Sequence, residues 1–267
     1  MQNKICLYLL VLMLFCMILA GCGEKVPEEV EDTSLRDIKE KGYMVLGVND
    51  SIPPLSFIDR NEQISGFDIE LVQEIANRLG VELNFETVGQ QDGITELENK
   101  NIDLLNGVIV SDEMKEKIEY SMNYLNKRYL YVIRRDSDIS SIDGLSNIKI
   151  GMLEGVSNQL DSEKYVWMTN NEVVTFSSKQ EALMELGLGK IDMVIMDEWF
   201  AKHINTQRPS EFKWLDEKID SGAYSMAFNK KDILFKQEVD RIIGEMMNDG
   251  FIENLSRKWF GERVITQ

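Results

Sequence analysis

The side chains of this chain that could perform chemistry are mostly carboxylates. Glu154 and Asp197 each follow a short apolar run, the place where a buried strand ends, and such a pair could act as general acid and base. His203 is the only histidine, and one imidazole does not build a site of several histidine ligands. We therefore expect no metal site and no cofactor.

The cysteines exclude another group of reactions. The chain has three, Cys6, Cys16 and Cys22, and none lies beyond residue 22. The remaining sequence therefore has no disulfide, no thiolate nucleophile and no cysteine–metal cluster. It also has no nucleophile elbow. Binding is favoured over catalysis.

Composition limits the class of partner. The chain has 267 residues, of which 43% are hydrophobic and 28% charged, as in a soluble globular protein. Its formal net charge is −17, whereas a protein that binds a nucleic-acid duplex needs a basic face. We expect no nucleic-acid partner.

The N-terminus has the layout of a targeting segment. Lys4 precedes an uncharged apolar stretch over residues 5–20, a length that suits a signal peptide better than a spanning helix. Leu19-Ala20-Gly21-Cys22 resembles the bacterial lipobox, which implies cleavage before Cys22 and acylation of its thiol. The sequence predicts a lipoprotein signal peptide over 1–21, an acylated cysteine and acidic tether over 22–34, and attachment to a membrane surface.

A pattern that occurs twice indicates the architecture. Asn101-Ile102-Asp103 and Lys190-Ile191-Asp192 each follow a helix-like stretch and open a short apolar run. Upstream, the segment 43–49 matches the segment 148–154, a strand that runs into a polar loop. Two similar α/β halves predict two lobes and a cleft between them.

Hydrophobic periodicity predicts the elements that position the carboxylates. The clearest helix has Asp68 as its N-cap, an apolar stripe from residue 69 to 79, and Gly80 as its end. Further predicted helices are 34–39, 93–99, 179–186, 239–248 and 251–259. Predicted strands are 44–48, 81–87, 102–105, 129–134, 148–152, 193–196 and 223–229. Strands that alternate with helices favour mostly parallel sheets.

Ligands of such sheets bind beyond the carboxyl ends of the strands. The loops expected at the cleft are 49–54, 106–111, 154–158 and 196–199.

Several segments together resemble family 3 of the bacterial extracellular solute-binding proteins, the amino-acid-binding components of ABC importers. They are Gly47–Phe57, Gly66–Leu71, residues 101–103 and 190–192, and Lys258-Trp259-Phe260-Gly261, in the family's order and spacing. The resemblance covers roughly residues 35–262. It implies a type II periplasmic-binding-protein-like α/β fold, with lobe 1 over 35–131 plus 227–262, lobe 2 over 132–226, and two hinge strands.

The same resemblance implies the function and the site. The chain would be a monomeric, extracytoplasmic binding protein, on the outer face of the membrane or in a periplasm, that closes on a small amine-bearing solute and delivers it to an ABC permease. Asp197 stands where the family pairs a carboxylate with the ligand's ammonium, and Ser157 and Gly155 stand where the ligand carboxylate is received. The complete set of implied contacts is Asn49, Ile52, Gln91, Asn106, Gly107, Lys115, Gly155, Ser157, Asn158 and Asp197.

The chain also departs from the family pattern. Asn49 and Ile52 replace an aspartate and a tyrosine, and Gln91 replaces an aromatic residue. The family's carboxylate-binding arginine falls at Met114 or Lys115, after an apparent one-residue deletion. Methionine cannot make the bidentate pair of an arginine, and lysine offers only a point charge. A ligand with an amine and a weaker or absent carboxylate would fit these changes.

Two alternatives remain open at this level. The same fold serves as the sensor domain of membrane receptors, so the chain could be a ligand-sensing protein that feeds a signalling receptor. Some relatives of the fold are dehydratases or cell-wall lytic enzymes, in which Glu154 and Asp197 would do acid–base work.

Overall fold

The computed structural model describes residues 31–89, 92–154, 156 and 166–263. The chain from Thr33 onward forms one compact unit. No helix in the described ranges combines the length and the apolar character that a membrane crossing requires.

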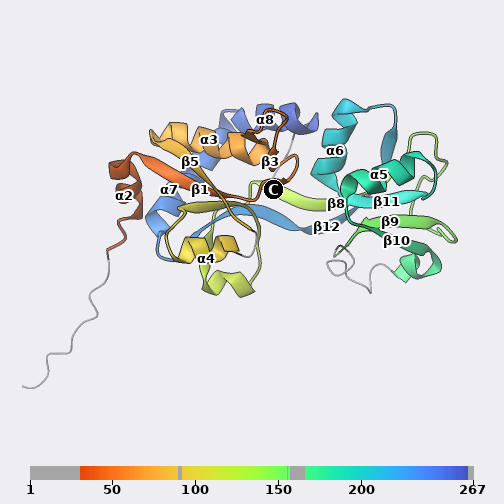
Figure 1. Ribbon diagram of the computed structural model, residues 1–267, viewed down its shortest axis with the longest axis horizontal. Helices are drawn as coiled ribbons and strands as arrows, with labels where there is room; N and C mark the ends of the chain where they lie inside the picture. Colours follow the sequence, from red (N-terminus) through yellow and green to blue (C-terminus); the bar gives the residue numbers. More distant parts are fainter. Residues whose placement is uncertain (1–30, 90–91, 155, 157–165, 264–267) are drawn as a thin grey trace, which may run out of the picture. The chain divides into compact units, whose positions relative to one another are not determined.

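The unit contains two groups of elements, which we call the first and second lobe, and two strands that connect them (Figure 1). The first lobe consists of α2 (Ser34–Lys41), β1 (Tyr43–Val48), β2 (Ser51–Ile52), β3 (Ser56–Ile58), β4 (Ile64–Ser65), α3 (Phe67–Leu79), β5 (Glu82–Thr87), α4 (Asp92–Glu98), β6 (Leu104–Ile109), the 3₁₀ turn η1 (Glu113–Glu116), β7 (Ile118–Tyr120), α7 (Ile233–Asn248) and α8 (Phe251–Phe260). The second lobe consists of β9 (Lys149–Leu153), η3 (Val166–Asn170), β10 (Glu172–Phe176), α5 (Lys179–Gly187), β11 (Met193–Asp197) and α6 (Glu198–Gln207). The connecting strands are β8 (Leu125–Arg134) and β12 (Phe212–Asn229).

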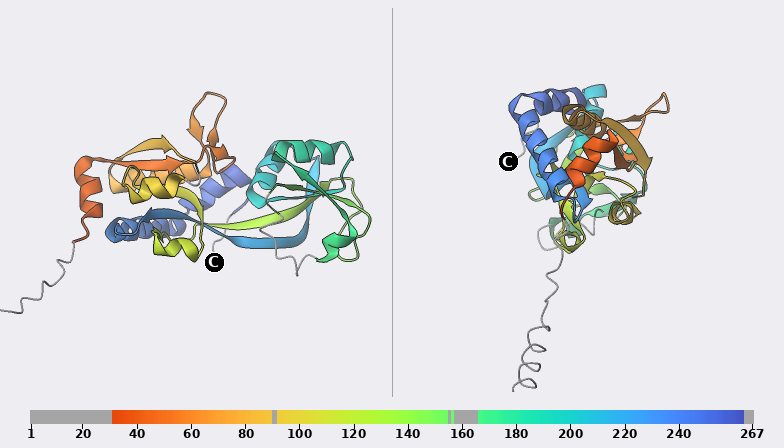
Figure 2. Two further views of the ribbon diagram at one scale, coloured as in Figure 1. Left: turned by 60° about the horizontal axis from the view of Figure 1, so that its bottom comes forward. Right: turned by 90° about the vertical axis from the view of Figure 1, so that its left-hand side faces the viewer.

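One hydrogen-bonded sheet runs through both lobes in the order β10-β9-β11-β8-β12-β6-β1-β5. Pairing is parallel within each lobe, between β1 and its neighbours β5 and β6 and between β9 and its neighbours β10 and β11. It is antiparallel wherever β8 or β12 takes part. Figure 2 shows these two long strands side by side between the lobes. The predicted parallel α/β lobes with two connecting strands are confirmed.

Alternation along the strands builds a hydrophobic core on each face of the sheet. In β1, Met44, Leu46 and Val48 pack under α3, α7 and α8, whereas Val45 packs toward α4 on the opposite face. Figure 1 shows α3 and α8 together on one side of β1 and α4 on the other. In the second lobe α5 and α6 cover one face through residues such as Leu186.

The repeated sequence pattern has the same structural role in both lobes. The Asp103 carboxylate accepts a hydrogen bond from Val45 N at 2.7 Å, and the Asp192 carboxylate accepts one from Lys149 N at 2.8 Å. Each aspartate thereby ties the strand that it precedes to the first strand of its lobe. The structure thus makes Val45 equivalent to Lys149, a register one residue away from the match of 43–49 with 148–154.

The glycine of each first strand belongs to the same arrangement. A Cβ on Gly47 would lie 2.4 Å from Ile102 Cδ1, and one on Gly151 would lie 2.7 Å from Ile191 Cδ1. The isoleucine of each motif therefore packs directly on backbone, which excludes a side chain at either glycine.

Two sequence expectations near the carboxyl ends of the first-lobe strands are wrong. Helix α3 begins at Phe67 with Gly66 as N-cap, so Asp68 lies inside the first turn, fully buried. The strand predicted to end at residue 105 continues as β6 to Ile109, so Asn106 and Gly107 lie in a strand and not in a loop. In both places a buried polar contact, described below, replaces the expected cap and turn.

Candidate functional site

The first lobe contains a small cavity at the carboxyl ends of β1 and β6. Its volume is about 170 Å³, and its lining is mostly apolar. The lining residues are Asn49, Ile52, Val88, Ile94, Leu105, Asn106, Gly107, Val108, Ile109 and Met114. Four of the predicted ligand contacts are thereby brought together: Asn49, Ile52, Asn106 and Gly107.

Local hydrogen bonds hold one rim of the cavity in shape. The Asn49 side-chain oxygen accepts from Ser51 N at 3.1 Å, and its backbone oxygen accepts from the Ser56 hydroxyl at 2.5 Å. These bonds close the turn after β1 and bring Ile52 of β2 to the cavity. An asparagine at this position thus serves the turn as well as the pocket.

A buried polar network supports the other rim. Asn106 Nδ2 and the Tyr124 hydroxyl each donate to Asp68 Oδ2 at 3.0 Å, and Gly107 N donates to the Tyr124 hydroxyl at 3.1 Å. Burial raises the pKa of Asp68 to about 7, against the two hydrogen bonds, which lower it. Gly107 has φ +64°, and a Cβ there would lie 3.2 Å from Asp68 Oδ2. The backbone of β6 at the cavity therefore requires glycine at this position.

The two candidates for the position of the family arginine differ in their surroundings. Met114 is half-buried and lines the cavity. The Lys115 side chain is 53% exposed and pairs with Asp112 at 2.6 Å, and its carbonyl accepts from Lys230 Nζ. The Asp112 carboxylate raises the pKa of Lys115 through a hydrogen bond. Lys115 thus does not line the cavity, and the structure does not bring it together with the other predicted contacts of the first lobe.

Asp197 lies at the carboxyl end of β11, as the sequence predicts, and also begins a helix that was not predicted. Its Oδ1 accepts from Trp199 N at 3.1 Å and from Phe200 N at 3.0 Å, so Asp197 is the N-cap of α6. Its Oδ2 receives the Tyr224 hydroxyl of β12 at 3.4 Å. Burial, and next the Asp197 charge, raise the pKa of Tyr224 well above its usual value. The second carboxylate oxygen is therefore directed toward the connecting strands.

A charged residue that the sequence analysis missed lies in the same neighbourhood. Lys127 of β8 is 6% exposed. Alternation places it on the same face as Tyr129, the register partner of Asp197, and its ammonium lies 5.5 Å from the Tyr129 ring centroid. Burial lowers the pKa of Lys127, and the Asp197 carboxylate acts in the opposite direction. The sequence gives little signal of its role, because Asn126 and Arg128 beside it in β8 are also polar.

Five predicted sites fall outside the described residues: Gln91, Gly155, Ser157, Asn158 and the acylation site Cys22. Glu154, the other member of the possible acid–base pair, is exposed just after β9.

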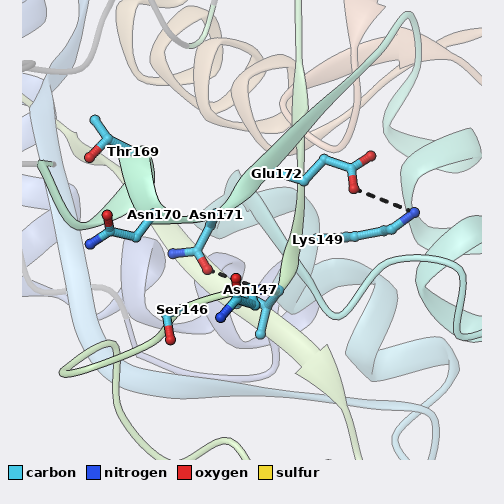
Figure 3. A pocket seen from close by; sticks show the side chains of 8 residues that line it. Ser146, Asn147, Lys149, Thr169, Asn170, Asn171 and Glu172 are labelled. Atoms are coloured by element: carbon cyan, nitrogen blue, oxygen red, sulfur yellow. Dashed lines mark hydrogen bonds and ion pairs between the residues drawn. The ribbon is translucent and has the colours of Figure 1, made fainter.

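A larger hollow of about 720 Å³ lies elsewhere in the second lobe, around the start of β9 (Figure 3). Its side chains are engaged locally: Asn171 accepts from Ile148 N at 3.1 Å and Lys149 pairs with Glu172 at 3.5 Å. None of the predicted ligand contacts lines it. Among the described residues no cluster of three or more histidine, cysteine, aspartate or glutamate side chains could hold a metal.

Comparison with known sequences identifies related proteins over most of the chain. The model of the family described as "Bacterial extracellular solute-binding proteins, family 3" matches residues 44–262. The L-cystine-binding protein TcyJ of Escherichia coli (strain K12) is 26% identical over 249 residues, which cover 91% of each chain. The L-cystine-binding protein TcyA of Bacillus subtilis (strain 168) is 23% identical over 253 residues, which cover 92% of this chain and 93% of that protein.

Comparison with solved structures supports the fold. A polar amino acid ABC uptake transporter substrate-binding protein from Streptococcus thermophilus superposes with a TM-score of 0.75 at 21% identity, over 88% of this chain and 92% of that one. The L-cystine solute receptor of Neisseria gonorrhoeae, in an unliganded open conformation, gives a TM-score of 0.71 at 22% identity, over 88% and 99%. The architecture is that of the type II periplasmic binding proteins.

Proposed function

We propose that this chain, which belongs to family 3 of the bacterial extracellular solute-binding proteins, captures a small amine-bearing solute between its lobes and delivers it to an ABC importer. The solute is an amino acid or a related compound. The relatives named for L-cystine bind a molecule of this class, which supports the proposal.

The observation that carries the proposal is the geometry of Asp197. Its Oδ1 is held by two backbone N–H groups of α6, which fixes the carboxylate in one orientation. Its Oδ2 is directed toward Tyr224 of β12, a strand shared by both lobes. A carboxylate fixed in this way is preorganised to accept a hydrogen bond from a ligand ammonium, so little ordering is lost on binding.

The rest of the proposed site comes from the first lobe. We propose that the cavity around Ile52 and Met114 receives the organic part of the solute, because its lining is mostly apolar and Asn49 and Asn106 are its polar side chains. Binding to both lobes would favour the closed form over the open one, which is the physical basis of recognition by a permease.

The proposed cellular setting follows the N-terminal sequence. We propose a signal peptide over 1–21, acylation and palmitate attachment at Cys22, a tether over 22–34, and an extracytoplasmic monomer on the membrane surface, with lobe boundaries at 131/132 and 226/227. Mass spectrometry of the mature protein tests this: a diacylglyceryl cysteine at the N-terminus would support it, and an unmodified Cys22 within the intact leader would contradict it.

A thermal-shift screen tests the binding function. The purified protein is heated with amino acids, amines, betaines and small peptides, one at a time. A ligand at a hundred times its dissociation constant adds about 2.7 kcal/mol to the stability of the folded protein, which raises Tm by several degrees. Any hit is then incubated with the protein and recovered, and we expect it unchanged. No shift across the panel would refute the proposed function, and a converted ligand would indicate an enzyme.

A further inference from the structure

None of the described residues that line the first-lobe cavity offers a positive charge to a ligand carboxylate. Met114, one of the two candidates for the position of the family arginine, lines this cavity together with the apolar residues Ile52, Val88 and Leu105. A carboxylate placed there would lose its hydration without gaining a charged partner, which costs several kcal/mol. If the solute carries an anionic group, that group must be held by another part of the site.

Lys127 supplies a positive charge close to the ammonium-binding carboxylate. It belongs to β8, and it shares a face with Tyr129, whose backbone is in register with Asp197 of β11. The Lys127 ammonium lies 5.5 Å from the Tyr129 ring. A lysine that is 6% exposed is costly for a fold, because burial disfavours its charged form. Buried charges of this kind concentrate at functional sites.

A second cation stands in the same region. Lys179, the first residue of α5, contributes a repulsive charge that lowers the pKa of Lys127, after burial, whereas Asp197 raises it. Its ammonium lies 4.8 Å from the centroid of the Phe200 ring, and Phe200 donates its backbone N–H to Asp197. The charge of Lys127 is thus coupled both to the Asp197 carboxylate and to a second ammonium, that of Lys179. Such a set favours a ligand that carries an anionic group in addition to its ammonium.

From this arrangement, and resting on the proposed function, we infer that Lys127 is a specificity-determining residue that binds the ligand's carboxylate. The ligand would be a zwitterionic amino acid with both charged groups held on the side of β8 and β11: the ammonium at Asp197 and the carboxylate at Lys127. Its side chain would then be free to enter the apolar cavity of the first lobe. A bare amine would leave Lys127 without its anionic ligand group and would bind more weakly.

Matched pairs of amino acid and decarboxylated amine test the inference. The probes are L-cystine with cystamine, L-arginine with agmatine, and L-histidine with histamine, measured by isothermal titration calorimetry. The variants are Lys127→Met, which keeps the length of the side chain without its charge, and Lys127→Arg, which keeps the charge. Lys190→Met is the control, because it removes one positive charge from an exposed side chain that pairs with Glu185.

We expect the wild-type protein to bind at least one of these amino acids and to prefer it to its amine by about tenfold or more. Lys127→Met should weaken amino-acid binding about 10- to 100-fold and leave amine binding within about threefold, which removes the preference. Lys127→Arg should retain part of it, and Lys190→Met all of it. The melting temperature of each variant reports whether it folds. We expect Lys127→Met to fold, because a stable fold tolerates replacement of a buried ammonium by an apolar chain of similar volume.

Three results would overturn the inference, and they are distinguishable. Unchanged amino-acid affinity in Lys127→Met would mean that Lys127 only neutralises Asp197, and the proposed function would stand. A wild-type preference for amines would assign the site to carboxylate-free ligands, again within the proposed function. No binding of any of the six probes by the wild type would count against the inference and the proposed function together.

Discussion

Asp197 has two roles in this structure, and substitution can separate them. Its Oδ1 caps α6 through two backbone N–H groups, and its carboxylate charge is proposed to bind the ligand's ammonium. Asp197→Asn keeps an oxygen that can cap the helix and loses the charge. Asp197→Ala loses both. The cap contributes typically about 1 kcal/mol, so the alanine variant should melt about 2–4 °C below the wild type and the asparagine variant close to it.

The effect on ligand binding should follow a different order. A hydrogen bond between charged groups contributes about 1.5–3 kcal/mol, so both variants should lose about 10- to 150-fold in affinity for whichever solute stabilises the wild type. Calorimetric titration and thermal melting measure the two effects separately. Asp192→Asn is the control, since its carboxylate lies before β11, at the opposite end from Asp197, and accepts a hydrogen bond from Lys149 N at the start of β9. That variant should lose stability and keep affinity. Full affinity in Asp197→Asn would refute the proposed role of the charge.

Three further predictions concern the first lobe. The pKa of buried Asp68 is raised from 3.8 to about 7, so the native state binds more protons than the unfolded state between about pH 4 and pH 7 and loses up to about 4 kcal/mol of stability as the pH rises through this window. Urea titrations should therefore show that the free energy of unfolding of Asp68→Asn rises relative to that of the wild type over this range. A difference that does not depend on pH would disprove the prediction. Gly107→Ala should lower the free energy of unfolding by about 1–2 kcal/mol, because the residue has φ +64° and its new Cβ would contact Asp68. Gly244→Ala, in the interior of α7 where a Cβ has no neighbour within 4 Å, should be neutral or stabilise by up to about 1 kcal/mol. Equal effects of the two substitutions would mean that the β6 backbone adapts. Lys115→Gln should leave ligand affinity within about threefold, because the Lys115 side chain faces solvent. Met114→Arg should shift the ligand preference toward compounds with a carboxylate, because Met114 lines the cavity. The reverse pattern would show that the match of residues after Ile109 with the family pattern is wrong.

Much of the fold could be predicted because local pattern and tertiary role coincide in it. The repeated Asn101-Ile102-Asp103 and Lys190-Ile191-Asp192 mark the same contact in each lobe, where the aspartate bonds the first strand and the isoleucine packs on its glycine. Alternating strands and helices were sufficient to predict two parallel lobes. The match of 43–49 with 148–154 is displaced by one residue because it does not align Gly47 with Gly151, the two glycines on which the isoleucines pack.

The site was harder to predict because its residues depend on long-range contacts. Asp68 has the type and position of a helix cap, but its partners are Asn106 and Tyr124, 38 and 56 residues away. Helix α6 was missed although Asp197 followed by Glu198 is a recognisable helix start. Lys127 could not be singled out from the sequence, since only the pairing of β8 with β11 brings it near Asp197.

The most direct measurement is a crystal structure of the protein with the strongest binder from the thermal-shift screen. We predict that the ligand's ammonium nitrogen lies within hydrogen-bonding distance of the Asp197 carboxylate, with the organic part of the ligand against Ile52 and Met114. A ligand bound between the lobes whose ammonium avoids Asp197, or one bound elsewhere on the molecule, would contradict the proposed site.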